Sequence, residues 1–191
     1  MFSWNVRRIL SATMAAAALA APGIVAAASP DKGANITFTA SGTFASTPVS
    51  GADTLKLAGQ PFTISIVGNS SKTPTKHGRN WAVFNPLNMT GTVNSGLIPN
   101  SPIPISATTA SLEQSVGASE DIFKAGFPVT VVGIALQVKA YLTLPGGTLT
   151  TPLLRPFSSV PLSSAATVTY SNSSAATVLG VDTGTIVATV Q

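Results

Sequence analysis

The stretch that decides the fold reads Ile134-Ala135-Leu136-Gln137-Val138-Lys139-Ala140-Tyr141-Leu142-Thr143-Leu144. Its even-numbered positions are all apolar, whereas the odd-numbered ones include Gln137, Lys139 and Thr143. Side chains on a β-strand alternate between the two faces of the sheet, so this pattern predicts a strand with one face in the core. Pro145-Gly146-Gly147 follows directly and is expected to end the strand in a turn.

Similar alternation recurs along most of the chain. It is clear at residues 36–41 and 62–67, and further strands are expected at 81–84, 89–93, 103–109, 129–132 and 149–154. The last third predicts a three-stranded meander at 166–170, 176–179 and 186–190, with turns at 172–173 and at Asp182-Thr183-Gly184. About ten short strands predict an all-β domain, as a two-sheet antiparallel β-sandwich or, alternatively, a β-barrel. An outer-membrane barrel fits less well, because aromatic residues are sparse.

Three segments depart from simple alternation. Ser111 and Gln114 have the spacing of a helix capping box, and Ser119-Glu120-Asp121 places acidic residues where a helix N-terminus favours them. Each signal allows only a short helix. The proline-rich segment 97–104 cannot donate a full set of ladder hydrogen bonds, so it is expected to cross between sheets or to run along an edge.

Residues 1–28 have the composition of a cleaved signal peptide. Arg7 and Arg8 precede an apolar run at 9–25, and Ala26 and Ala28 provide small residues at a cleavage site. The prediction is therefore a signal helix at 1–28 and a single all-β domain at 29–191. We expect a secreted or periplasmic protein with no membrane span after cleavage of the signal.

Composition narrows the function classes. The chain has no cysteine, which excludes disulfides, thiolate metal sites and thiol catalysis. Its 10 Lys and Arg residues exceed its 6 Asp and Glu residues. Two of those arginines belong to the predicted signal, so the mature domain carries little excess charge and nucleic-acid binding is not expected.

Catalytic constellations are missing from the sequence. His77 is the only histidine, and no Gly-x-Ser-x-Gly motif accompanies it. One histidine without cysteine does not make a zinc site. No catalytic, cofactor-binding or metal-binding residue is assigned, and the leading interpretation is a non-enzymatic structural, surface or binding module. The alternative is a secreted hydrolase with a shallow acidic site, drawn from the acidic residues Asp31, Asp53, Glu113, Glu120, Asp121 and Asp182.

One segment concentrates positive charge. Lys72, Lys76, His77 and Arg79 are followed directly by Trp81, in a stretch whose composition predicts an exposed loop. These residues form a candidate anion-binding or glycan-binding loop, whose partner would be an anionic polysaccharide or another component of the cell envelope. The alternative is a hydrophilic loop followed by a tryptophan of the core.

The beginning of the predicted domain resembles a known group of proteins. The residues concerned are Phe38-Thr39-Ala40-Ser41-Gly42-Thr43-Phe44, Val49-Ser50-Gly51 and the stretch 55–64. They are similar to the opening strands of uncharacterised secreted bacterial all-β proteins, many of which carry a Pro-Glu-Pro sorting tail. That tail is absent from this sequence, which ends in Val190-Gln191. The resemblance implies a bacterial, exported, non-enzymatic protein and assigns no site residue.

Overall fold

A computed structural model describes residues 33–172 and 175–191, and in these ranges the protein is all-β, as predicted. The predicted signal segment 1–28 lies outside them. No helix long and apolar enough to cross a membrane occurs in the described part of the chain. The strands are β1 (Asn35–Ser50), β2 (Pro61–Asn69), β3 (Lys76–His77), β4 (Trp81–Ser95), β5 (Ile98–Ser115), β6 (Glu120–Val131), β7 (Ile134–Pro145), β8 (Phe157–Pro161), β9 (Thr167–Ser171) and β10 (Ala176–Val190).

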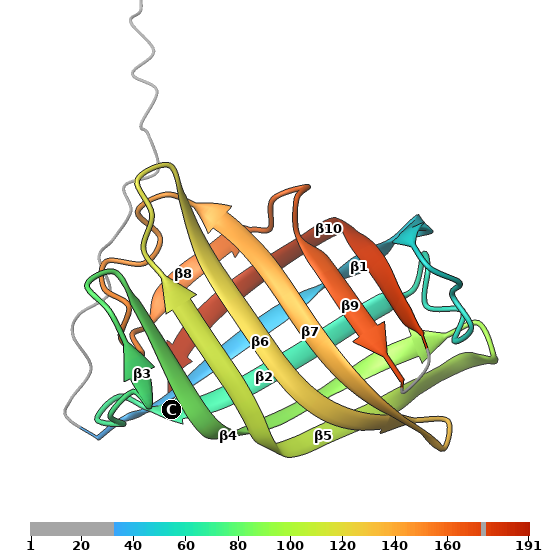
Figure 1. Ribbon diagram of the computed structural model, residues 1–191, viewed down its shortest axis with the longest axis horizontal. Helices are drawn as coiled ribbons and strands as arrows, with labels where there is room; N and C mark the ends of the chain where they lie inside the picture. The colour runs from blue at the N-terminus through green and yellow to red at the C-terminus, as the bar shows by residue number, and fades with distance from the viewer. Residues whose placement is uncertain (1–32, 173–174) are drawn as a thin grey trace, which may run out of the picture.

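The strands form one closed antiparallel barrel (Figure 1). Its wall follows the order β1, β2, β4, β5, β6, β7, β9 and β10, and β10 returns to pair with β1. That closing ladder begins at Ile36 opposite Val190 and continues to Gly42 opposite Gly184 without a shift. The β-barrel alternative is therefore confirmed and the two-sheet sandwich is not, because the first and last strands pair with each other instead of ending two separate sheets.

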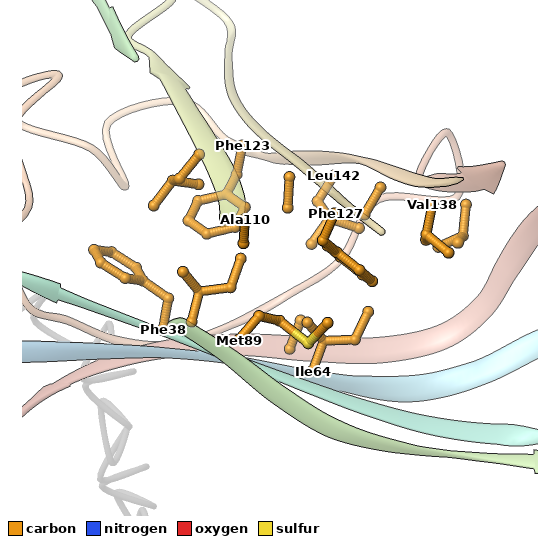
Figure 2. Close-up of a cluster of buried hydrophobic side chains, with 14 of the residues drawn as sticks. Phe38, Ile64, Met89, Ala110, Phe123, Phe127, Val138 and Leu142 are labelled. Carbon is orange, nitrogen blue, oxygen red and sulfur yellow. The ribbon is translucent and has the colours of Figure 1, made fainter. Parts of the chain in front are cut away.

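Apolar side chains fill the barrel interior (Figure 2). On β7 the residues from Leu136 to Leu142 alternate as predicted, with Val138 buried and Lys139 exposed. The prediction is wrong at the two ends of the strand, because Ile134 is exposed and Thr143 is buried. Phe38 packs against Phe123 with ring centroids 5.4 Å apart. Two cavities inside the barrel are small, at about 10 Å³ and about 40 Å³, and Tyr170 lines the second. Ligand pockets occupy ~300–1,000 Å³, so this barrel is a packed core rather than a container.

The outward-facing side chains are mainly small and polar. Thr39 on β1 and Ser65 on β2 are register partners, and their hydroxyl oxygens lie 3.0 Å apart. Further along the wall, Gln137 and Lys139 of β7 are exposed. The barrel therefore has a largely polar outer face around an apolar interior.

Loops close both ends of the barrel, and a carboxylate holds each of them. At the end where β1 begins, which we call the basic end (left in Figure 1), the buried Asp121 accepts hydrogen bonds from the backbone N–H groups of Gly117 (3.0 Å) and Leu149 (2.7 Å). At the opposite hairpin end, Asp53 accepts from the N–H groups of Leu57 (3.0 Å) and Ala58 (2.7 Å). Each carboxylate replaces water for backbone groups that the barrel ends would otherwise leave unpaired.

Both helix predictions are wrong. Ser111 lies in β5 opposite Gly126, and Glu120 and Asp121 open β6 opposite Pro145 and Leu144. An acidic residue is favourable at a helix N-terminus because it accepts unpaired N–H groups. Asp121 does accept such groups, but they come from two loops at the barrel end.

The predicted turn at Asp182-Thr183-Gly184 is also wrong. Residues 176–190 form the single strand β10, which replaces the last two strands of the expected meander. The register moves from Thr183 opposite Thr43 to Val181 opposite Phe44, so Asp182 is the extra residue of a β-bulge. Turn-forming residues here bend a strand rather than reverse it.

The expected strand at 149–154 is a loop instead, and its Leu149 and Leu154 side chains are buried under the basic end. The loop leads into β8, which pairs with β10 at residues 185–188, beyond the reach of the short β9. Phe157 of β8 points into the core, with its ring 6.2 Å from that of Phe38. β8 therefore completes the barrel wall beside β10.

The proline-rich segment 97–104 was expected to cross between sheets or to run along an edge, and the second of these is confirmed. β5 pairs with β4 along most of its length but with β6 only at Ser111 to Ser115. Residues 98–110 thus have no strand partner on the β6 side among the described strands.

Candidate functional site

A surface hollow of about 260 Å³ lies at the basic end of the barrel. Two segments distant in sequence form it. One is the β2–β4 connection with the start of β4, which contributes His77, Gly78 and Trp81; the other is the β7–β8 loop, which contributes Pro152 and Leu153. We call this site the basic-end hollow.

The β3–β4 hairpin fixes the position of Trp81. His77 is the register partner of Ala82, and the N–H of Gly78 donates to the carbonyl of Trp81 over 2.8 Å. The indole lies over Gly78, where a Cβ atom would collide with its Nε1. Glycine is therefore required at position 78, since any side chain would push the ring out of the hollow.

Trp81 is a surface residue, with 39% of its area exposed. Its neighbours Ala82 and Phe84 point into the barrel and are buried. The alternative that Trp81 belongs to the core is therefore wrong. Indole is a large and rigid surface that combines an apolar face with one N–H donor, which is a common arrangement at binding sites.

The positive charges of the β2–β4 connection do not line this hollow. His77 and Trp81 line it directly, whereas Lys72, Lys76 and Arg79 lie on the same connection but are not among the described lining residues. Lys76 and Arg79 are exposed and Lys72 is half-buried. Among residues 33–172 and 175–191, one ion pair is formed, between Lys124 and Glu113 at 2.8 Å. Lys72, Lys76 and Arg79 therefore have no acidic partner within these ranges.

The sequence did not indicate the second wall of the hollow. Pro152 and Leu153 lie some seventy positions beyond Trp81, in a loop that was expected to be a strand. The bond from the N–H of Leu149 to Asp121 anchors the start of this loop. The only sequence signal was Asp121 itself, whose role as a loop anchor is not visible without the fold.

Acidic residues in the described part of the chain are dispersed. Asp53 holds a loop at the hairpin end, Asp121 holds loops at the basic end, and Glu113 pairs with Lys124 on the outer wall. Glu120 and Asp182 are exposed. No group of three or more His, Cys, Asp or Glu side chains in these residues is placed to hold a metal ion.

No protein-family model, curated protein or solved structure matches this chain. The function of the basic-end hollow is therefore inferred from its geometry and charge.

Proposed function

We propose that this protein is an exported, non-enzymatic binding module that holds an anionic polysaccharide of the cell envelope at the basic-end hollow. The observation that carries the proposal is the exposed indole of Trp81, placed in a hollow formed in part by the connection that also carries Lys72, Lys76 and Arg79. An envelope location rests on the predicted signal peptide.

The hollow suits a sugar ring in shape and chemistry. Trp81 offers a rigid apolar face for the C–H groups of a sugar, and His77 offers a polar group beside it. Leu153 forms an apolar part of the opposite side and is 39% exposed. A pyranose ring can therefore enter between the two segments.

The surrounding cations select for negative charge on the ligand. Lys76 and Arg79 are exposed and have no acidic partner within the described ranges, so they attract a polyanion over ~10 Å at 0.1 M salt. A repeating acidic polymer can place one sugar in the hollow and neighbouring charges along Lys76 and Arg79. We expect the contact with Trp81 to make binding specific, and the attraction by Lys76 and Arg79 to make it depend on salt.

The test compares two variants that remove the same charge. Lys76→Ser/Arg79→Ser and Lys56→Ser/Lys139→Ser each remove two positive charges from exposed positions, but only the first pair lies on the connection that forms the hollow. Binding to immobilised polygalacturonate and heparin is measured against salt, with uncharged dextran as the matrix control. The first variant should bind more weakly, with a salt-dependence slope lower by roughly two; the second should resemble the parent protein.

Trp81→Ala separates the indole from the charges. It should weaken binding at every salt concentration without changing the slope, because it removes contact area and no charge. Equal retention of the two double variants, or no retention of the parent protein at low salt, would overturn the proposal.

A further inference from the structure

The barrel wall has an open seam between β5 and β6 toward the hairpin end. The two strands pair only from Ser111 opposite Gly126 to Ser115 opposite Ile122. Beyond that ladder, β5 bends away (Figure 1), so that residues 98–110 of β5 and 127–131 of β6 face a gap. Each edge remains paired on its other side, to β4 and β7 respectively.

Prolines lie on both edges of the seam. Pro102 and Pro104 lie on the β5 edge, and Pro128 lies on the β6 edge. A proline within a paired strand is tolerated where its ring nitrogen faces the unpaired side, because it has no N–H to donate. Each of these prolines therefore removes one possible donor from its edge, while its carbonyl oxygen can still accept a hydrogen bond. Prolines on an edge strand also disfavour the addition of a further strand.

A hollow of about 410 Å³ occupies the outer side of this seam. Ser106 lines it from β5, Thr130 from β6, Gln137 from β7 and Ser171 from β9. Ser106, Thr130 and Gln137 are exposed, and Val129 and Leu136 add apolar surface at its floor. None of the described lining residues is charged. Its volume falls within the ~300–1,000 Å³ of small-molecule sites.

We propose that this seam hollow binds an uncharged polyhydroxylated ligand, namely a neutral saccharide. Prolines reduce the number of N–H donors at these edges, and sugar hydroxyl groups can donate to edge carbonyl oxygens. The side chains of Ser106, Thr130 and Gln137 can both donate and accept, which matches hydroxyl groups in either role. Because no charged side chain lines the hollow, it gives an anionic polymer no advantage. The proposal goes beyond the function assigned to the basic-end hollow and does not depend on it.

Two register partners provide a matched pair of variants. Ser106 and Thr90 face each other across the β4–β5 ladder, and both side chains are exposed on the outer wall. Ser106 lines the seam hollow, whereas Thr90 is not among its described lining residues. Ser106→Trp therefore fills the hollow, and Thr90→Trp adds the same side chain one strand away. Both should retain the parent melting temperature, since neither position is buried.

The experiment follows backbone amide resonances of the full domain during titration with neutral trisaccharides of glucose, galactose, mannose and N-acetylglucosamine. At least one should shift resonances around Gln137 and Ser171, with unchanged affinity between about 0.05 and about 0.5 M salt. Ser106→Trp should weaken that affinity at least roughly tenfold, whereas Thr90→Trp and Lys76→Ser/Arg79→Ser should leave it unchanged. The last variant separates this result from a failure at the basic-end hollow.

Three outcomes would overturn the proposal. The first is that none of the trisaccharides shifts the seam resonances. The second is that Ser106→Trp and Thr90→Trp bind the sugar equally well. The third is that an uncharged extended peptide, and no sugar, binds in a manner that Ser106→Trp blocks, which would make the seam a strand-addition site.

Discussion

Replacing Asp121 with alanine should loosen the basic end of the barrel more than any exposed substitution nearby. The Asp121 side chain is fully buried, and its two oxygens accept the N–H groups of Gly117 (3.0 Å) and Leu149 (2.7 Å). Asp121→Ala would leave both donors without this acceptor. It would also release the β7–β8 loop that carries Pro152 and Leu153.

The expected loss follows from these two bonds. A hydrogen bond to a charged group contributes ~1.5–3 kcal/mol, so the pair contributes ~3–6 kcal/mol. Removing the charge also relieves part of the cost of burying it, and we expect a net loss of ~3–5 kcal/mol in the free energy of unfolding. For a domain of this size, each kcal/mol lowers the melting temperature by ~2–4 °C.

Urea unfolding followed by circular dichroism measures this loss directly. Glu120→Ala is the matched control, because Glu120 is the adjacent residue, carries the same charge and is exposed. It should change the free energy of unfolding by less than ~0.5 kcal/mol. Similar losses in the two variants would refute the assignment of Asp121 as a loop anchor.

Two further predictions concern the barrel wall and the hairpin end. Val138→Asp places an unpaired carboxylate in the core and should cost several kcal/mol, whereas Lys139→Glu changes only the exposed face; equal thermal melts would contradict the assigned facing. Burial, with the Asp53 carboxylate adding to it, raises the pKa of the Tyr170 phenol above 10.0, and that hydroxyl donates to Asp53 over 2.8 Å. The resulting stability is present at neutral pH and lost as pH rises above about 10 through the higher pKa of the folded state. Tyr170→Phe should therefore be less stable than the parent protein at neutral pH but lose less stability in alkali. Unfolding curves at about pH 8 and about pH 11 would show whether the difference in free energy of unfolding between the two proteins becomes smaller.

The facing of individual strands could be predicted from the sequence because it depends on local alternation. Val138 and Lys139 differ in burial as a period of two requires, and Pro145 ends β7 as expected. The same local information placed Trp81 beside the cations of the β2–β4 connection. Structural features that depend only on about ten neighbouring residues could therefore be predicted from the sequence.

Structural features that depend on residues distant in the sequence could not be predicted. Nothing near Ile36 or Val190 shows that these strands pair with each other and close a barrel instead of a sandwich. Asp182 has the composition of a turn, yet pairing of β10 with β1 on both sides of it turns it into a bulge. Pro152 and Leu153 reach the basic-end hollow only through the anchor at Asp121.

The closing ladder between β1 and β10 also brings the beginning and the end of the barrel together. Ile36 lies opposite Val190, and the N–H of Gln191 donates to the carbonyl of Asn35 over 2.9 Å. A host protein could therefore accept the whole barrel as an insertion through two adjacent connections, without stretching either one. Both connections would leave from the basic end. The host would lie beside Trp81, and the hairpin end with its seam would project away from it.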